Sequence, residues 1–340
     1  MKHYDIITVG GAVRDLTFYT ERGKIIKNPT DLTAQKLLAF EYGAKININD
    51  AALTCGGGAA NTAVSFAKLG FKTAALARLG NDSDGNHLKL NLRKAGVATD
   101  LLQYDNFLAT GFSIILGVNN REKEHVALLY RGANCDLDAS EKSFKSISAD
   151  YLYLTSLSGR NWGKALKNVF YYAKKIKAKV AWNPGNLQLQ AGKKVIAKYL
   201  AQTKILILNK DEAIELVLSG IKVGRRDPKF LNKPVYLLNI LNELGPKIIV
   251  ITEGESGATA FKDGKIYKIK ALKKIEADTT GVGDAFGSAF VAGIIYHKGD
   301  IKQSLIWGIL NSGSVVTKIG AQNGILSRKE ILETAKRVKQ

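Results

Sequence analysis

Hydrophobic positions recur along the chain with two different periods, and this pattern predicts an α/β protein. Short apolar runs bounded by polar residues or glycine are typical of buried strands, and the first spans residues 5–10. Longer stretches with an apolar residue at every third or fourth position predict helices, such as residues 59–69, which Gly70 ends. Beyond residue 151 the two patterns alternate regularly, which favours a parallel sheet with helices on its faces.

The predicted elements cover most of the chain. We expect strands at 5–10, 72–79, 111–118, 125–130, 151–154, 179–182, 204–208 and 247–252, and a hairpin at 258–270. We expect helices at 59–69, 84–95, 161–177, 190–201, 210–218, 234–243 and 327–338, and a long helical stretch at 284–318 with a break near 297–300.

Two segments, about 16–55 and 107–133, do not follow this alternation. The second contains the pattern of an antiparallel hairpin around the polar turn 119–124. No internal repeat or low-complexity linker divides the chain. We therefore expect a single domain over residues 1–340, a three-layer α/β/α fold with a mostly parallel central sheet, and a small β lid made by the two segments.

Composition narrows the class of protein further. The 340 residues are 46% hydrophobic and 24% charged, as in ordinary globular proteins, and no apolar run reaches the roughly 18 residues of a membrane span. The N-terminus has no signal-peptide layout, and two cysteines, Cys55 and Cys135, do not suggest a disulfide framework. The sequence thus predicts a cytoplasmic protein with no membrane partner.

The net charge of +20 allows two interpretations. A strongly basic chain can bind nucleic acid, but a lysine-rich solvated surface gives the same total. Here the lysines are spread along predicted helices, for example between residues 164 and 179, and no aromatic residues alternate with a basic run. We therefore expect no nucleic-acid partner; tight binding with a steep salt dependence would reverse this expectation.

The segment 278–286 (DTTGVGDAF) contains the strongest chemical signal. Gly281 and Gly283 flank Val282, and Asp284 stands where a long apolar helix is predicted to begin. Glycines and a helix start together direct several N–H groups towards one point, which makes an anion site suited to phosphate. Asp284 could accept the proton of an attacking hydroxyl, or it could merely cap the helix. The segment is neither a Walker A loop nor a dinucleotide-binding fingerprint.

A second glycine-rich segment, Gly56 to Asn61, precedes the predicted helix 59–69. Gly57 and Gly58 would let a ligand approach the backbone closely, and the side chain of Asn61 can both donate to and accept from a hydroxyl. A tight turn followed by a helix cap would explain the same residues.

Together the two segments resemble the two signatures of the ribokinase-like (PfkB) carbohydrate kinase family, in the expected order and at the expected distance. The resemblance extends over nearly the whole chain and implies a mostly parallel sheet with helices on both sides and a small β lid. It implies a kinase that moves the γ-phosphate of ATP to a hydroxyl of a sugar, with Asp284 as the base and the N–H groups of Gly281 to Asp284 around the phosphate. Val282 departs from the family, which usually has alanine there, and the insertion at 20–50 is longer and more charged than a minimal lid.

The resemblance also assigns roles to other positions. Asp15, with Gly57, Gly58 and Asn61, would bind the acceptor, although Asp15 read by itself could be a turn residue. Asn183, Asn209, Thr252, Gly254 and Gly257 would lie on the nucleotide side. Asn209 and Glu212 would organise Mg²⁺ and its waters, although the same pair read by itself is a helix capping box. A K⁺ site would involve Asp278, Thr280, Val315, Gly320 and Gly324.

Two competing functions remain open from the sequence. A nucleoside kinase of the same family would require an apolar, aromatic pocket beside Asp15, for which Phe18 and Tyr19 are candidates. A non-catalytic regulator that binds a nucleotide or sugar would not need Asp284 or the pair Asn209 and Glu212, both of which are intact. A homodimer formed through the lid is a further expectation from the resemblance.

Overall fold

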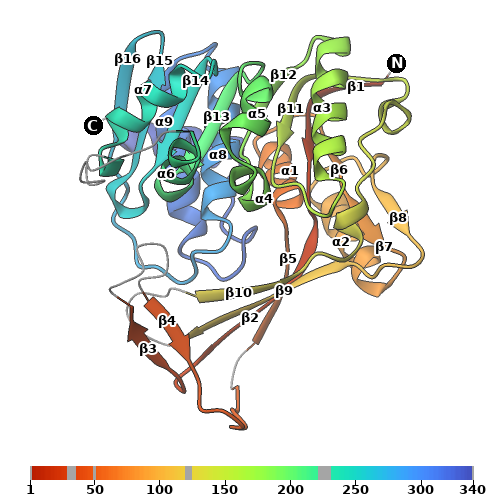
Figure 1. Ribbon diagram of the computed structural model, residues 1–340, viewed down its shortest axis with the longest axis vertical. Helices are drawn as coiled ribbons and strands as arrows, with labels where there is room; N and C mark the ends of the chain where they lie inside the picture. The colour runs from red at the N-terminus through yellow and green to blue at the C-terminus, as the bar shows by residue number, and fades with distance from the viewer. Residues whose placement is uncertain (1, 29–35, 49–50, 119–124, 221–230, 339–340) are drawn as a thin grey trace.

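The computed structural model describes residues 2–28, 36–48, 51–118, 125–220 and 231–338. Its main feature is an eight-stranded sheet in the order β16-β15-β14-β13-β12-β11-β1-β6 (Figure 1). The strands are β1 (Lys2–Val9), β6 (Thr73–Leu76), β11 (Ile147–Leu154), β12 (Lys179–Trp182), β13 (Ile205–Asn209), β14 (Ile248–Thr252), β15 (Ala258–Lys262) and β16 (Lys265–Ile269). The pairs from β6 through to β14 are parallel, and β15 and β16 are joined antiparallel at the edge. The predicted mostly parallel sheet is confirmed.

Helices cover both faces of this sheet, as Figure 1 shows. They are α1 (Gly58–Lys68), α2 (Ser83–Lys94), α3 (Trp162–Ile176), α4 (Asn186–Gln190), α5 (Gly192–Leu200), α6 (Lys210–Leu218), α7 (Pro234–Asn242), α8 (Val282–Tyr296), α9 (Ile301–Val315) and α10 (Arg328–Val338). Short 3₁₀ turns lie at Gly132–Asp136, Glu141–Phe144 and Gly254–Ser256. The long helical stretch expected at 284–318 is two helices, α8 and α9, separated at the expected break.

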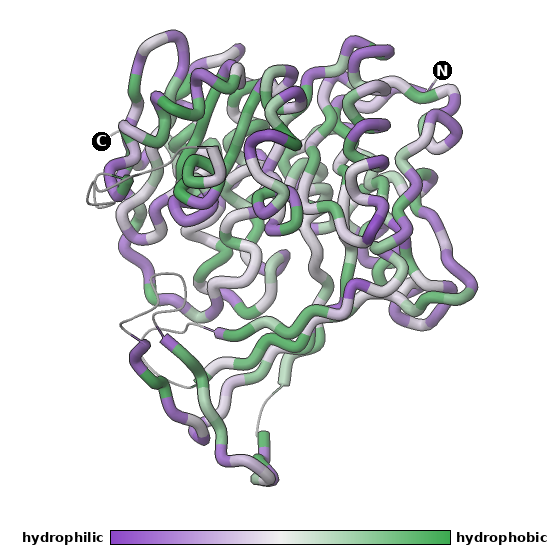
Figure 2. Tube along the Cα trace, viewed as in Figure 1, coloured by the Kyte–Doolittle hydropathy of each residue, from purple (hydrophilic) through white to green (hydrophobic). Residues whose placement is uncertain are grey.

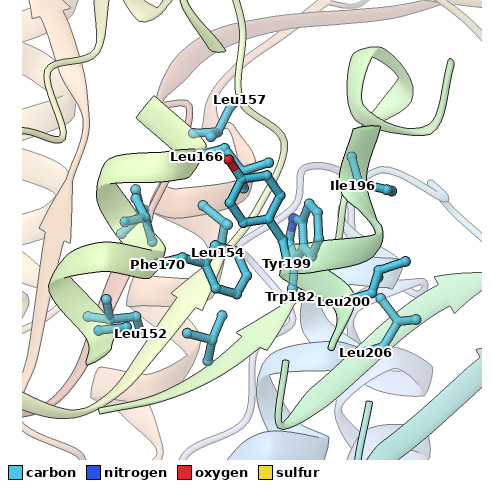
Figure 3. Close-up of a cluster of buried hydrophobic side chains, with 14 of the residues drawn as sticks. Leu152, Leu154, Leu157, Leu166, Phe170, Trp182, Ile196, Tyr199, Leu200 and Leu206 are labelled. Atoms are coloured by element: carbon cyan, nitrogen blue, oxygen red, sulfur yellow. The ribbon is translucent and has the colours of Figure 1, made fainter. Parts of the chain in front are cut away.

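Strand side chains alternate between two hydrophobic clusters, one on each face of the sheet. In β14, Ile249 and Ile251 face a cluster with α3, α5, α6 and α7, whereas Ile248 and Val250 face a cluster with α1, α8, α9 and α10. Figure 3 shows the first cluster, in which Trp182 lies among side chains from α3 and α5, and in Figure 2 the central strands are the most continuous hydrophobic segments. Strands buried on both faces read as unbroken apolar runs, which is why the sequence pattern located them.

A second sheet of four strands lies beside the helical layers, below them in Figure 1. Its strands, in the order β10-β9-β2-β5, are β10 (His125–Tyr130), β9 (Gly111–Val118), β2 (Val13–Thr20) and β5 (Ala51–Gly56). β9 and β10 form the antiparallel pair that the sequence predicted, and their turn at 119–124 lies outside the described residues. An antiparallel pair of strands, β3 (Lys24–Lys27) and β4 (Lys36–Ala39), lies between β2 and β5 in the sequence.

Two details differ from the sequence prediction. The strand expected at 72–79 is divided, because β7 (Arg78–Gly80) leaves the central sheet and pairs with β8 (Gln103–Asp105). The helix expected at 190–201 is α5 preceded by the separate short helix α4, since Gly192, the first residue of α5, adopts a φ of 76°. Among the described residues, no helix is both long and apolar enough to span a bilayer.

Candidate active site

The loop that leads into α8 makes a sharp turn at its glycine. Gly281 is the N-terminal cap of α8 with a φ of 74°, a backbone conformation that favours glycine. A Cβ there would lie 2.3 Å from the Cβ of Ala321, so the loop also packs tightly against the segment that follows α9. The first amides of an α-helix have no acceptor within the helix and carry a partial positive charge. The start of α8 thus has the features of an anion site.

Asp284 lies in the first turn of α8 and does not act as its cap. Its Oδ2 accepts a hydrogen bond from Nδ2 of Asn61 at 2.8 Å, so the side chain is directed across to α1. The pKa of Asp284 is raised to about 6, mainly by burial; the hydrogen bond from Asn61 opposes the rise, and the charge of Asp15 contributes to it. A carboxylate with a pKa near neutrality and a fixed orientation is suited to accept a proton.

Asp15 lies in the middle of β2, not in a turn, and is 3% exposed. Ser113 of the neighbouring strand β9 donates a short hydrogen bond to its Oδ1. The pKa of Asp15 is raised to about 6, mainly by desolvation; the bond from Ser113 opposes the rise, and the charge of Asp278 contributes to it. Because a Cβ at Gly56 would fall 1.7 Å from Oδ2 of Asp15, the first glycine of the 56–58 segment leaves room for this carboxylate.

The glycines at the start of α1 bring two chain segments together. Gly57 has a φ of 92°, and a Cβ there would lie 2.6 Å from the carbonyl oxygen of Gly11. Gly57 and Gly58 line a cavity of about 50 Å³ between the first strand end and the second sheet, together with side chains that include Phe112, Tyr130 and Ser156. Two of the predicted acceptor residues, Gly57 and Gly58, therefore adjoin a space enclosed partly by the second sheet, whereas Asp15 and Asn61 are not among the residues that line it.

Asn61 is almost fully buried and has two side-chain partners. Besides donating to Asp284, it accepts at Oδ1 a hydrogen bond of 3.0 Å from Nε2 of Gln322. Both ends of the amide are thus engaged. In this structure Asn61 orients Asp284 rather than presenting itself to an acceptor hydroxyl.

The predicted nucleotide-side residues follow three adjacent parallel strands. Asn183, Asn209 and Thr252 stand at or just after the carboxyl ends of β12, β13 and β14, where ligands bind in open α/β sheets. Asn183 donates from Nδ2 to the carbonyl of Ile207, which ties β12 to β13. Gly254 has open space around it, whereas a Cβ at Gly257 would collide with the carbonyl of Ile269 at 2.0 Å.

Asn209 and Glu212 form a capping box at the start of α6. The Glu212 amide donates to Oδ1 of Asn209, and the Asn209 amide donates to Oε2 of Glu212, both at 2.8 Å. The pKa of Glu212 is raised to about 7, mainly by burial; the bond from the Asn209 amide opposes the rise, and the charges of Glu215, Asp284 and Asp211 contribute to it. A partly buried carboxylate with negative neighbours, set beside an amide oxygen, is a donor set that fits a hard divalent cation.

The residues expected at a monovalent-cation site also come together. Oδ1 of Asp278 accepts from the amide and hydroxyl of Thr280, and Oδ2 accepts from the Gly320 amide at 2.8 Å. A Cβ at Gly324 would lie 2.6 Å from Cα of Val315, so these two segments are in contact as well. Asp278 is fully buried, and no lysine or arginine in the described ranges forms an ion pair with it. A buried negative charge without a cationic side chain fits a bound cation.

Sequence reasoning missed three residues that hold the site. Ser113 supports Asp15, Gln322 supports Asn61, and His125 of β10 contacts the hydroxyl of Thr279 at 3.3 Å between Nδ1 and Oγ1. None of them belongs to a recognisable local pattern, because each acts through a contact that only the folded chain creates.

Phe18 and Tyr19 are the aromatic residues expected beside Asp15 in a nucleoside kinase. Strand alternation places Tyr19 on the same face of β2 as Asp15 and Phe18 on the opposite face.

Comparison with known proteins defines the class of this site. The model of the pfkB family carbohydrate kinases matches residues 25–328. A ribokinase from Haemophilus influenzae is 28% identical over 284 residues, which cover 82% of this chain and 86% of that relative.

Solved structures agree with this on the fold. Ribokinase from Arabidopsis thaliana, solved with ribose and ATP, superposes with a TM-score of 0.77 at 20% identity over 99% of both chains. A nucleoside kinase from Methanocaldococcus jannaschii superposes with a TM-score of 0.70 at 22% identity over 98% of both chains. The chain belongs to the pfkB family of carbohydrate kinases, and its reaction is the ATP-dependent transfer of phosphate to a sugar or a nucleoside.

Proposed function

We propose that this kinase phosphorylates a hydroxyl of a sugar and that Asp284 is its general base. The observation that carries the proposal is the position of Asp284, in the first turn of α8 beside the Gly281 turn, held by Asn61 and with its pKa raised to about 6. One carboxylate is thus placed to remove a proton at the point where helix amides can bind an oxyanion.

The proposed reaction is an in-line displacement at the γ-phosphorus of ATP. The acceptor oxygen forms a bond to phosphorus, its proton passes to Asp284, the bond to the β-γ bridging oxygen breaks, and ADP leaves. The N–H groups of Gly281, Val282, Gly283 and Asp284 would stabilise the charge on the phosphoryl oxygens. Val282 takes part only through its backbone, so the valine in place of the usual alanine should affect the reaction little.

The remaining predicted site residues would bind the acceptor, the nucleotide and the cations. Asp15, desolvated and supported by Ser113, would accept hydrogen bonds from acceptor hydroxyls, with the backbone at Gly57 and Gly58 alongside. Asn183, Thr252, Gly254 and Gly257 would lie along the nucleotide. Mg²⁺, held through Asn209 and Glu212, would supply charge neutralisation of the phosphates. K⁺ near Asp278, Thr280, Val315, Gly320 and Gly324 would offset the buried charge of Asp278.

We propose that the second sheet serves as a lid on a single domain. It contributes Asp15 and Ser113 to the site, and His125 contacts Thr279 just before the anion loop, so movement of this sheet would act on both substrates. Its strands also expose large apolar side chains, such as Leu53 at 59% and Leu128 at 55%. A homodimer formed through this sheet would cover them.

A nucleoside acceptor is the second candidate, and one contact favours it. The rings of Phe112 and Tyr130, from β9 and β10, lie with their centroids 5.1 Å apart, and both residues line the cavity beside Gly57 and Gly58. Exposed aromatic faces can stack on a base. The similarity in fold to a nucleoside kinase is consistent with this alternative.

An ADP-release assay with MgATP distinguishes the two candidates. The acceptors would be ribose, fructose, fructose phosphates, adenosine, cytidine and guanosine. A response confined to a sugar supports the proposal, and a response confined to nucleosides replaces it with the alternative. ATP binding with no acceptor-dependent ADP release from any of them would favour a non-catalytic regulator.

A further inference from the structure

A second, larger cavity lies on the other side of β2 and β5 from Asp15. It has a volume of about 420 Å³, within the range of small-molecule sites, and is open to solvent. Its walls come from β2, β5, α1, α2 and the segment after α9. Consecutive residues of a strand point to opposite faces, so Arg14 lines this cavity while Asp15 faces the active site.

The lining of this cavity is basic and polar. Arg14, Lys68 and Lys94 contribute positive charge, and Asn91 and Gln322 contribute amides. None of the described residues that line it is acidic, and Oδ1 of Asp84, outside the lining, is 3.3 Å from Nε of Arg14. Arg14 is paired with this carboxylate and Lys68 donates to the carbonyl of Ile325, so the lining has a surplus of positive charge although these two side chains have partners.

One buried polar atom of the lining, Nε of Arg14, lacks a hydrogen-bond partner within the described residues. Arg14 is only 6% exposed, and its Nη1 donates to the carbonyl of Thr54 and to Sγ of Cys55. Its Nε makes no hydrogen bond within the described part of the protein and is held by the ion pair with Asp84. Buried polar atoms of this kind are usually satisfied by protein, water or ligand, and here the adjoining space is the cavity.

We propose that this cavity is a regulatory site for a small metabolite that carries a phosphate or a carboxylate group. An anionic group can interact with the positive charge of Lys68, Lys94 or Arg14, while Asn91 and Gln322 provide directional hydrogen bonds. The volume leaves room for an organic portion beyond the anionic group.

A line of hydrogen bonds connects this cavity to the base. Nδ2 of Asn91 donates to Oε1 of Gln322 at 2.7 Å, Nε2 of Gln322 donates to Oδ1 of Asn61 at 3.0 Å, and Nδ2 of Asn61 donates to Asp284 at 2.8 Å. An anion that draws the Asn91 or Gln322 amide towards itself would weaken the bond that holds Asn61, and hence the orientation of Asp284. A second connection is direct, because Arg14 and Asp15 are neighbours in one strand.

Equilibrium dialysis of the full chain with labelled inorganic phosphate, and separately with citrate, tests binding without requiring turnover. The pocket variant is Lys68→Gln/Lys94→Gln, and the matched control is Lys164→Gln/Lys167→Gln, which removes the same charge from the exposed side of α3. We expect the pocket variant to lose affinity about tenfold, and the control to stay within about twofold of wild type. Phosphate bound at the start of α8 would contribute equally in all three proteins.

The two anions also distinguish the two classes of ligand. Tighter binding of phosphate would indicate a phosphate ester, and tighter binding of citrate would indicate a carboxylate. Equal affinities in the pocket variant and the wild type, or no binding of either anion, would overturn the proposal.

The regulatory part of the proposal is tested by the pH dependence of kcat. The bound anion should shift the acid limb in the wild type and not in the pocket variant. An unshifted limb with the anion bound would overturn that part. Lack of turnover in every protein would refute the proposed function and leave the dialysis result standing.

Discussion

Nδ2 of Asn61 donates a hydrogen bond to Oδ2 of Asp284 at 2.8 Å, and the two residues are 223 positions apart in the chain. This contact joins the first glycine-rich segment to the second and links the start of α1 to the start of α8. It also opposes the effect of burial on Asp284, since donation to the carboxylate favours its charged form. The contact therefore bears on both the geometry and the protonation of the proposed base.

The pH dependence of turnover should follow Asp284. With its pKa raised to about 6, the fraction of base that can accept a proton falls as the pH falls through that value, so the acid limb of kcat should lie near pH 6 rather than near 4. Asn61→Ala removes the hydrogen bond that lowers this pKa, and the limb should move up by about one unit. The measurement is kcat against pH at saturating substrates.

Asn86→Ala is the control for that experiment, because Asn86 is an exposed residue of the neighbouring helix α2. Its acid limb should coincide with that of the wild type. A limb in Asn61→Ala that stays in place or moves to lower pH would show that the hydrogen bond does not stabilise the charged form of Asp284.

Removing the charge of Asp284 should stabilise the fold. The pKa of this carboxyl is about 6 in the folded protein and 3.8 for an aspartate in the unfolded chain, so its ionised form costs stability above about pH 6, and the cost is lost as the pH falls towards 3.8. Asp284→Asn keeps an acceptor for Asn61 without the charge. We expect its free energy of unfolding to be higher by about 1–2 kcal/mol at pH 8 and by about half as much at pH 5.

Denaturant unfolding at the two pH values measures this difference. Asp263→Asn is a suitable control, because Asp263 is exposed in a turn with a φ of 48°, which asparagine also adopts. A variant that is less stable than the wild type at pH 8 would mean that the ionised Asp284 is stabilised by its surroundings.

Gly283→Ala should separate the anion site from the fold. No heavy atom lies within 4 Å of the position that a Cβ would take at Gly283, so alanine should fit in α8 and raise stability by about 0.5–1 kcal/mol. The same Cβ would enter the space that we assign to the transferring phosphate, and kcat should fall by about tenfold or more. Thermal unfolding and ADP release measure the two effects.

The matched control is Gly163→Ala, since Gly163 is also a helical glycine with open space around it, but in α3. It should gain similar stability at unchanged turnover. If Gly283→Ala were equally active, the phosphate would not lie against this turn of α8.

Asp15→Asn should weaken acceptor binding with less effect on ATP. A buried carboxylate that accepts from a substrate hydroxyl contributes about 1.5–3 kcal/mol, so KM for the acceptor should rise about 10- to 100-fold. Asp136→Asn, at an exposed carboxylate, provides the control. An unchanged acceptor KM in Asp15→Asn would remove Asp15 from the acceptor site.

Local patterns predicted the parts of the site that depend on a short stretch of chain. The turn at Gly281 and the helix after it follow from residues 281–286 alone, as does the capping box of Asn209 and Glu212. Likewise, the unbroken apolar run of β14 located a strand that is buried on both faces.

Local sequence patterns could not predict the contacts between distant segments of the chain. β2 was not predicted as a strand because polar residues occupy its buried positions: Arg14 and Asp15 are both buried, one towards each face. Ser113 and Gln322 acquire their roles only through Asp15 and Asn61, which the fold brings to them across the chain. The likeness to a known family brought the two glycine segments together, and the structure adds the residues that support them.

The most direct test of the account is the turnover of Asp284→Asn with MgATP and the acceptor that the wild type uses, measured beside Asp263→Asn. Asparagine keeps the size of the side chain and the contact with Asn61 but cannot take up the proton. The account predicts a fall in kcat of about 10²- to 10⁴-fold with nucleotide binding retained, and wild-type turnover in the control. Turnover close to wild type in Asp284→Asn would contradict the assignment of Asp284 as the base.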